Sequence, residues 1–438
     1  MKIKFYIAAA LLTGAAGMYA ADFSARPFFS EKVVGLNGSD YLIPVGITNS
    51  GTQTISEISY KIECDGKTIN GTYTFTPELG TRPSNFRWID VKVPVPEAQG
   101  EYDIVMTIDK INGNDNENSR TSERTVLISS PIEVKNRPLV DEYTGLWCGA
   151  CPMGYVALET LSEKYGHDFV AAAWHNGDAM TTMPAYPTNV PSYPNSAVNR
   201  GSLQPVNNIE ANWEEARHQY TPAAISVTTE FGDDSRSTLV AKAKVTFVEN
   251  VDYADYGIGY ILIADELSDP SWRQANNYAG THSLVGKYAE LFNEGRSMVS
   301  GLIFNDVVMG SSRAKGELNT IPTSVKAFRD YEHEYTFKLT MANAAGNIIA
   351  HDKEKLRVIA YVYDRNQEKI VNSCSSLYAG QEGSGIDETL AEDLEIIGTL
   401  WYDLSGRKAS ADTEGILIRA DIHSNGKVTT TKVVNRGK

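Results

Sequence analysis

The sequence has little cysteine and no long hydrophobic run beyond its first twenty residues. It holds four cysteines among 438 residues, namely Cys64, Cys148, Cys151 and Cys374. Small extracellular folds stapled by disulfides use cysteine at a much higher density, so such a fold is excluded. A membrane-spanning helix needs about 20 consecutive apolar residues, so none is expected after the N-terminal segment.

Positive charge and histidine are also scarce. Forty Lys and Arg face 55 Asp and Glu, which gives a formal net charge of −15 at pH 7. A field of this sign repels nucleic acid and anionic membranes, so neither is expected as a partner. The seven histidines show no paired spacing, and Pro152 stands where a c-type haem site needs histidine. No metal site is therefore expected.

The first twenty residues, 1–20, predict a secretory signal peptide. Lys2 and Lys4 precede an apolar run that ends in small residues, and cleavage is expected near Ala20 or Ala16. The apolar run is too short for a spanning helix. An exported protein is expected.

The remaining chain is too long for one ordinary core and is expected to form several domains. Residues 21–136 alternate apolar and polar side chains in short runs, which is typical of an N-terminal immunoglobulin-like β-sandwich. The alternation returns over 223–385, which predicts a second β-sandwich with an insertion. Residues 386–438 hold three strand-like pieces and are expected to form a C-terminal β tail, with a sorting or anchoring role as one possibility.

Residues 137–222 show a different pattern. A short apolar stretch leads into the close cysteine pair, and a helix is expected from there to Tyr165. The unbroken apolar run Phe169–Trp174 predicts a strand that is buried on both faces. A further strand and a second helix, ended by Pro222, complete the pattern of a small α/β domain.

Cys148 and Cys151 stand three positions apart at the predicted start of a helix. In that position they lie on one face, and the helix N-terminus stabilises a thiolate at the first cysteine. Cys148 would then be a nucleophile and Cys151 a resolving thiol, and together they close a reversible disulfide. A permanently closed, structural disulfide is the alternative. Cys64 and Cys374 are expected to be small buried hydrophobic residues rather than a long-range disulfide.

The order strand, Trp-Cys-x-x-Cys, helix resembles the thioredoxin fold. The resemblance implies an acidic residue six positions before the first cysteine, which is Glu142, with a role in proton transfer. An ordinary exposed carboxylate is the alternative for this residue. The resemblance also implies a cis-proline before a strand, which fits Pro194 after Tyr193 better than the competing prolines 184, 187 and 191. Ala150 departs from the family, which usually has proline there.

The longer stretch Tyr143–Gly154 resembles the outer-membrane-protein-28-related family of exported bacterial proteins. The segments Trp174-His-Asn-Gly-Asp and Phe304-Asn-Asp-Val-Val agree with it, and the resemblance covers roughly 137–380. It implies export to the periplasm, to the outer membrane surface or out of the cell. The C-terminal Tyr402-Asp-Leu-Ser-Gly-Arg-Lys is similar to type IX secretion sorting domains, which implies surface attachment. A last β-hairpin of the preceding sandwich is the alternative.

The predicted fold class is therefore α+β and multidomain, with a thioredoxin-like α/β domain between immunoglobulin-like β-sandwich domains. The leading functional hypothesis is an exported thiol–disulfide oxidoreductase that acts on protein thiols and disulfides. It needs no cofactor beyond the redox-active disulfide Cys148–Cys151. The residues expected to act are Cys148, Cys151 and Glu142 in catalysis, and Trp147, Tyr193 and Pro194 in substrate binding. The alternative is a cell-surface or outer-membrane binding or adhesion protein. In this interpretation the thioredoxin-like domain is a scaffold, the cysteine pair is a structural disulfide, and the partner is a surface protein.

Overall fold

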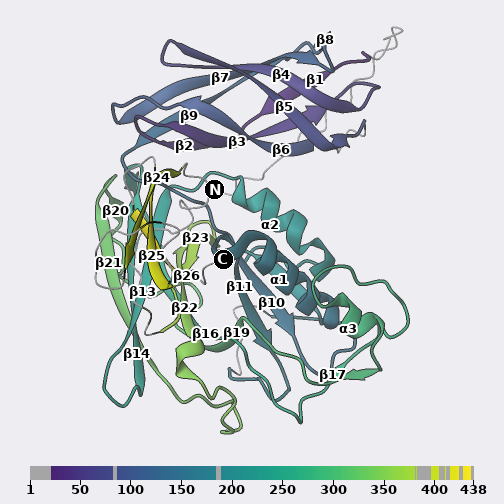
Figure 1. Ribbon diagram of the computed structural model, residues 1–438, viewed down its shortest axis with the longest axis vertical. Coiled ribbons are helices and arrows are strands. Elements are labelled where there is room, and N and C mark those ends of the chain that lie inside the picture. The colour runs from purple at the N-terminus through teal and green to yellow at the C-terminus, as the bar shows by residue number, and fades with distance from the viewer. Residues whose placement is uncertain are drawn as a thin grey trace. The chain divides into compact units, whose positions relative to one another are not determined.

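The computed structural model describes residues 21–81, 86–183, 189–379, 381, 396–403, 410, 415–423 and 428–435 (Figure 1). The chain divides into two compact units, Met1–Gln381 and Glu382–Lys438. The predicted signal peptide, residues 1–20, lies outside the described residues. No helix within the described ranges is long and apolar enough to cross a membrane.

The first part of the larger unit is a β-sandwich, drawn in purple and blue in Figure 1. One sheet has the order β1 (Ala25–Phe28), β3 (Asp40–Asn49), β6 (Phe86–Pro94). The other has the order β2 (Lys32–Leu36), β9 (Ser122–Ser130), β7 (Gly100–Ile111), β4 (Ile55–Cys64), β5 (Lys67–Leu79), with β8 (Asn114–Asp115) beside β7. Alternate side chains such as Ile43, Val45 and Ile47 are fully buried, because side chains along a strand point to opposite faces in turn. The predicted β-sandwich character is confirmed.

A seven-stranded mixed sheet follows. Its order is β12 (Asn195–Val198), β10 (Leu139–Thr144), β11 (Val170–His175), β19 (Val307–Ser311), β16 (Tyr256–Ala264), β22 (Leu356–Asp364), β23 (Lys369–Ser375). Strands β10 and β11 are parallel and are connected through helix α1 (Pro152–Tyr165). Every residue of β10, β11 and β16 is buried, which explains the nearly continuous apolar runs of β11 and β16, while β10 also buries Asp141 and Glu142.

The predicted fold class is wrong, because the molecule is β-rich. In the described residues, the α-helices are α1, α2 and α3, with 14, 9 and 5 residues. Strands β10, β11 and β12 do not form a thioredoxin-like α/β domain of their own between two immunoglobulin-like sandwiches. They continue through β19 into strands that the sequence pattern had placed in a separate sandwich.

The reason for this continuation is a shared hydrophobic core. On one face of the sheet, Tyr143 and Trp174 of the first strands pack in one cluster with Ile263, Ile359 and Tyr361 of the later strands. Strand β11 also pairs in parallel with β19 through Ala173 and Val307, so its second edge is covered. Separating the two halves would expose this apolar surface to water.

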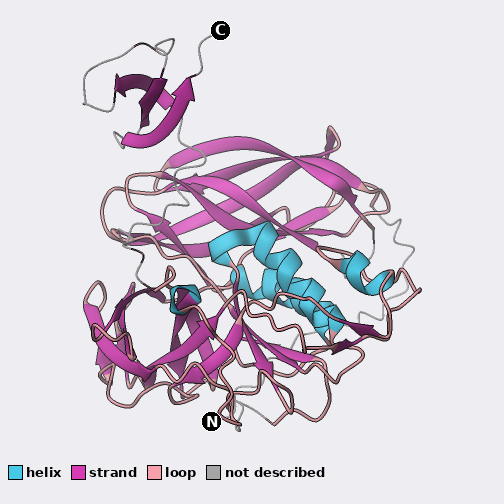
Figure 2. Cartoon of the chain, turned by 60° about the horizontal axis from the view of Figure 1, so that its bottom comes forward, coloured by secondary structure: helices cyan, strands magenta, loops and turns pink. Residues whose placement is uncertain are grey.

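Two kinds of element cover the opposite face of the same sheet. Helices α1 and α2 (Ile209–Arg217) lie side by side over β10 and β11, as Figure 2 shows, with Leu161 and Trp213 in their core. Over β16 and β22 lies a three-stranded sheet of order β13 (Ala223–Phe231), β14 (Thr238–Phe247), β21 (Asp330–Lys338).

Short elements complete the larger unit. They are α3 (Ala289–Asn293), the strand pairs β15 (Val251–Asp252) with β20 (Ser324–Val325) and β17 (Gln274–Ala275) with β18 (Met298–Val299), and the 3₁₀ turns η1 (Gly166–Asp168), η2 (Val206–Asn208) and η3 (Lys353–Lys355). The smaller unit holds an antiparallel sheet of β24 (Ile396–Asp403), β25 (Gly415–His423) and β26 (Val428–Asn435). The three strand-like pieces expected at the C-terminus are thus present as strands.

Candidate functional site

Cys148 and Cys151 form a disulfide in the loop between β10 and α1, and their Cα atoms lie 5.3 Å apart. The helix begins at Pro152, after the pair, with Cys151 at its N-cap. The prediction that Cys148 opens the helix is therefore wrong. Proline is favoured at the first helical position because its missing N–H has no partner there anyway. The Cys148 amide instead donates to the Gly145 carbonyl at 3.0 Å, within a turn.

A distant part of the chain is hydrogen-bonded to the loop that carries this disulfide. We call residues 145–150 the cysteine loop and residues 274–278, which include β17, the covering segment. Hydrogen bonds run from the Ala275 amide to the Leu146 carbonyl (2.7 Å), from the Asn277 amide to the Gly149 carbonyl (2.8 Å), from Gln274 Nε2 to the Cys148 carbonyl (3.0 Å) and from the Tyr278 hydroxyl to the Ala150 carbonyl (3.3 Å). Cys148 is 5% exposed and Cys151 is 1% exposed.

Gly149 makes the close approach of these two segments possible. A Cβ atom at this position would lie 2.3 Å from Asn277 Oδ1, far inside van der Waals contact. A side chain at 149 would therefore push the covering segment away from the loop. The small residue between the cysteines serves packing here, which the sequence alone did not reveal.

The other side of the cysteine loop is held by Asp178. Its Oδ2 accepts a hydrogen bond from the Leu146 amide at 2.8 Å and lies 2.7 Å from His175 Nδ1. Burial alone would raise the pKa of Asp178, but His175 and the surrounding amides outweigh burial and hold the pKa below its ordinary value. Asp178 is therefore a charged anchor for the loop, a role that its sequence position did not indicate.

Of the predicted substrate-binding residues, Trp147 lies in the cysteine loop and contacts Tyr193, which precedes Pro194. The Trp147 ring is edge-to-face with the Tyr193 ring at a centroid distance of 5.4 Å. Trp147 Nε1 donates to the Asn176 carbonyl at 2.6 Å, and Asn176 Nδ2 donates to the Tyr193 hydroxyl at 3.0 Å. The peptide bond from Tyr193 to Pro194 is cis, as predicted. Trp147 nevertheless remains 53% exposed, and its role in binding stays a prediction.

Glu142 lies in β10 and is only 2% exposed, which rules out an ordinary surface carboxylate. Its side chain packs against Gly154 in the first turn of α1, where a Cβ would lie 2.2 Å from Glu142 Oε1. Burial raises the pKa of Glu142 to about 8, the nearby Asp306 adds to this effect, and a hydrogen bond with Thr144 opposes it. Within the described residues, Oε1 has no hydrogen-bond partner.

The surroundings of the two other cysteines and of Arg200 indicate structural roles for them. Cys64 and Cys374 are both free and buried, as predicted, and burial raises the pKa of the Cys374 thiol to about 12. Arg200 lies 3.5 Å from the buried carboxylate of Asp141 and forms an ion pair with it. Across the described part of the chain, no group of three or more His, Cys, Asp or Glu side chains is arranged to hold a metal ion.

We predict that Glu142→Gln changes the pH dependence of folding. A carboxyl group with a raised pKa favours the folded state below pH 4.5, and this contribution is lost as the pH rises toward about 8. The amide cannot ionise, so the variant should match the wild type near pH 5 and be more stable at pH 8.5. The pKa rises from 4.5 to about 8, and one pKa unit is about 1.4 kcal/mol, so the gain should be on the order of 5 kcal/mol. Urea unfolding at both pH values measures it.

Glu163→Gln is the matched control, because Glu163 is exposed on the same helix that packs against Glu142. This control should change stability by less than about 0.5 kcal/mol at either pH. Equal stability of Glu142→Gln and wild type at pH 8.5 would contradict the burial of an ionisable group at this position.

Comparison with known proteins finds no matching family model and no matching curated protein. Among solved structures, HBP35 of Porphyromonas gingivalis is similar, with 14% identity over 69% of this chain and 99% of that chain and a TM-score of 0.36. A domain of the outer membrane lipoprotein Omp28 from the same organism has 13% identity over 37% and 93% of the two chains and a TM-score of 0.20. The CARDB domain of a Pyrococcus furiosus protein has 16% identity over 27% and 95% and a TM-score of 0.20. These similarities include the family that the motif around the cysteine pair resembles, but scores below 0.5 assign neither family nor function.

Proposed function

We propose that the chain is an exported binding protein of the cell surface or outer membrane. Its binding site is the exposed Trp147 of the cysteine loop together with the partly buried Tyr193 that contacts it. The Cys148–Cys151 disulfide has a structural role in this proposal, because it keeps the loop in the shape that presents Trp147. The partner is a protein segment with an apolar side chain that packs on the indole ring.

The observation that carries the proposal is the exposure of Trp147 in a fixed position. More than half of the side chain is in solvent, although its indole N–H is bonded to Asn176 and its ring contacts Tyr193. Burying a large apolar side chain is worth roughly 1.5–3 kcal/mol. A ring already held in place loses little conformational entropy on binding, which is why tryptophan is enriched at the centres of interfaces.

The environment of the disulfide supports a structural role. Both cysteines are almost fully buried, and the covering segment bonds to the Cys148 and Gly149 carbonyls. An incoming thiol would have to displace part of this layer to reach sulfur. A permanently closed disulfide that stabilises a binding loop does not need to be accessible to a thiol.

We predict that Trp147→Ala abolishes partner binding without unfolding the protein. The side chain is half exposed, so its loss should change stability little, whereas the interface would lose its central ring. Immobilised whole chain would be used to retain proteins from an outer-membrane extract of the producing cells. At least a tenfold loss of the retained partner is expected.

Tyr253→Ala is the matched control, since Tyr253 is an aromatic residue that is 92% exposed outside the cysteine loop. This variant should retain the partner as well as the wild type does. If Trp147→Ala retained the same proteins in the same amounts as the wild type, the aromatic pair would not be the binding site.

A second candidate function is thiol–disulfide exchange, which the buried carboxyl of Glu142 favours. In this reaction the Cys148 thiolate attacks a substrate disulfide, forms a mixed disulfide and releases one substrate thiolate. Glu142, whose pKa burial raises to about 8, accepts the Cys151 proton in its ionised form. The Cys151 thiolate then displaces the second substrate thiolate, so two electrons pass to the substrate and the Cys148–Cys151 disulfide forms.

This second candidate is tested by insulin reduction with dithiothreitol as the electron donor. Exchange at this centre predicts turnover above the uncatalysed rate, complete loss with Cys148→Ser and at least a tenfold loss with Glu142→Gln. A wild-type rate equal to that of Cys148→Ser would exclude the oxidoreductase function and leave the binding function in place.

A further inference from the structure

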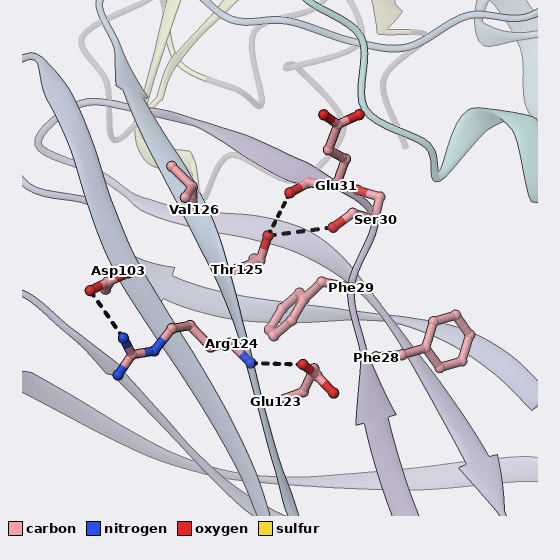
Figure 3. A pocket seen from close by; sticks show the side chains of 9 residues that line it. All are labelled: Phe28, Phe29, Ser30, Glu31, Asp103, Glu123, Arg124, Thr125 and Val126. Carbon is pink, nitrogen blue, oxygen red and sulfur yellow. Dashed lines mark hydrogen bonds and ion pairs between the residues drawn. The ribbon is translucent and has the colours of Figure 1, made fainter. Parts of the chain in front are cut away.

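The N-terminal sandwich contains a pocket of about 450 Å³ where the chain crosses from β1 to β2 (Figure 3). Its lining consists of the crossing residues Phe28, Phe29, Ser30 and Glu31, together with Asp103 of β7 and Glu123, Arg124, Thr125 and Val126 of β9. None of these residues belongs to the cysteine loop or to the covering segment, so this pocket is a separate feature of the molecule.

The pocket exists because β2 covers only part of the edge of β9. Strand β9 pairs with β7 from Ser122 onward, but its pairing with β2 begins at Val126, opposite Lys32. Before Lys32 the chain belongs to the crossing from the other sheet, and Thr125 Oγ1 donates to the Glu31 carbonyl at 3.0 Å to hold that crossing. Among the described strands, none pairs with residues 122–125 on this side.

The backbone groups of this edge point into the open side. The Ile108 amide donates to the Thr121 carbonyl at 2.9 Å, which makes these two residues a hydrogen-bonded pair. Hydrogen-bonded and non-bonded pairs alternate along an antiparallel ladder, so Ser122 and Arg124 direct their N–H and C=O groups away from β7. The Arg124 amide donates instead to Glu123 Oε1 at 3.3 Å, as Figure 3 shows.

The charge of the pocket selects the kind of strand that fits there. Three carboxylates line it, from Glu31, Asp103 and Glu123, against one guanidinium from Arg124. That guanidinium already lies 3.4 Å from the Asp103 carboxylate. The lining is therefore negative overall and favours lysine and arginine side chains, while Phe29 offers an apolar surface between them.

We propose that the edge of β9 from Ser122 to Thr125 binds an extended cationic peptide segment as an added β-strand. The peptide backbone bonds the outward N–H and C=O groups of Ser122 and Arg124, and its basic side chains face Glu31 and Glu123. Unpaired strand edges accept strands in this way, with backbone bonds giving affinity and alternate side chains giving specificity. Four residues of strand span about 13 Å, so a short segment fills the site. This site does not depend on the function assigned to Trp147.

The probe is the fluorescein-labelled peptide Thr-Lys-Val-Lys-Val-Thr, measured by fluorescence anisotropy against the whole chain. We expect it to bind at least tenfold tighter than Thr-Glu-Val-Glu-Val-Thr, and to bind more weakly as salt is raised. The same cationic peptide N-methylated at both lysines and both valines lacks the central backbone donors in either register and should bind at least tenfold more weakly. Equal binding of the methylated peptide would overturn strand addition, whatever the variants do.

Two protein variants locate the site. Arg124→Pro removes the outward N–H without removing a bond to β7. This variant should bind the cationic peptide at least tenfold more weakly than the wild type does. Arg124→Gln keeps the amide and removes the positive charge, so it should bind the peptide as well as or better than the wild type. Unchanged binding by a folded Arg124→Pro, or no binding of the cationic peptide to the wild type, would refute the proposal.

Discussion

The hydrogen bonds between residues 274–278 and the backbone of the cysteine loop are the constraint on which the candidate site depends. They join segments more than 120 residues apart in the sequence, and they hold residues 274–278 against the loop that carries the Cys148–Cys151 disulfide. Cys148 and Cys151 are almost fully buried, whereas the Trp147 side chain of the same loop is 53% exposed. Asp178 also accepts a hydrogen bond from the Leu146 amide, so the loop is held both by Asp178 and by residues 274–278.

The seven-stranded sheet provides the rigid base for this arrangement. Its first strands carry Glu142 under α1 and His175 beside the loop, and its later strands complete the core on the other face. The burial of Glu142 is a consequence of this packing, because its side chain is enclosed between the sheet and the first turn of the helix. A carboxyl group in that position resists ionisation whether or not it takes part in a reaction. Its raised pKa therefore fits both candidate functions.

Features encoded locally were predictable from the sequence. The spacing of Cys148 and Cys151 predicts a disulfide, the resemblance to the thioredoxin fold implies the cis bond before Pro194, and the isolation of Cys64 and Cys374 predicts buried free thiols; the structure shows all three. The prediction of the fold class was wrong because the fold depends on the pairing of two strands that are far apart in the sequence. The contact of Ala173 with Val307 joins two regions that the alternating pattern had separated, and no periodicity within either region reveals it. The packing role of Gly149 could not be predicted for the same reason, since its neighbour Asn277 is far along the chain.

The most direct test of the central claim is the rate at which dithiothreitol reduces the Cys148–Cys151 disulfide, followed by alkylation and mass spectrometry. If the covering segment encloses a structural disulfide, reduction in the folded protein should be at least tenfold slower than in urea. Gln274→Ala, which removes the bond to the Cys148 carbonyl, should recover part of that difference in a protein that remains folded. Reduction of the folded wild type as fast as the unfolded chain would contradict the account.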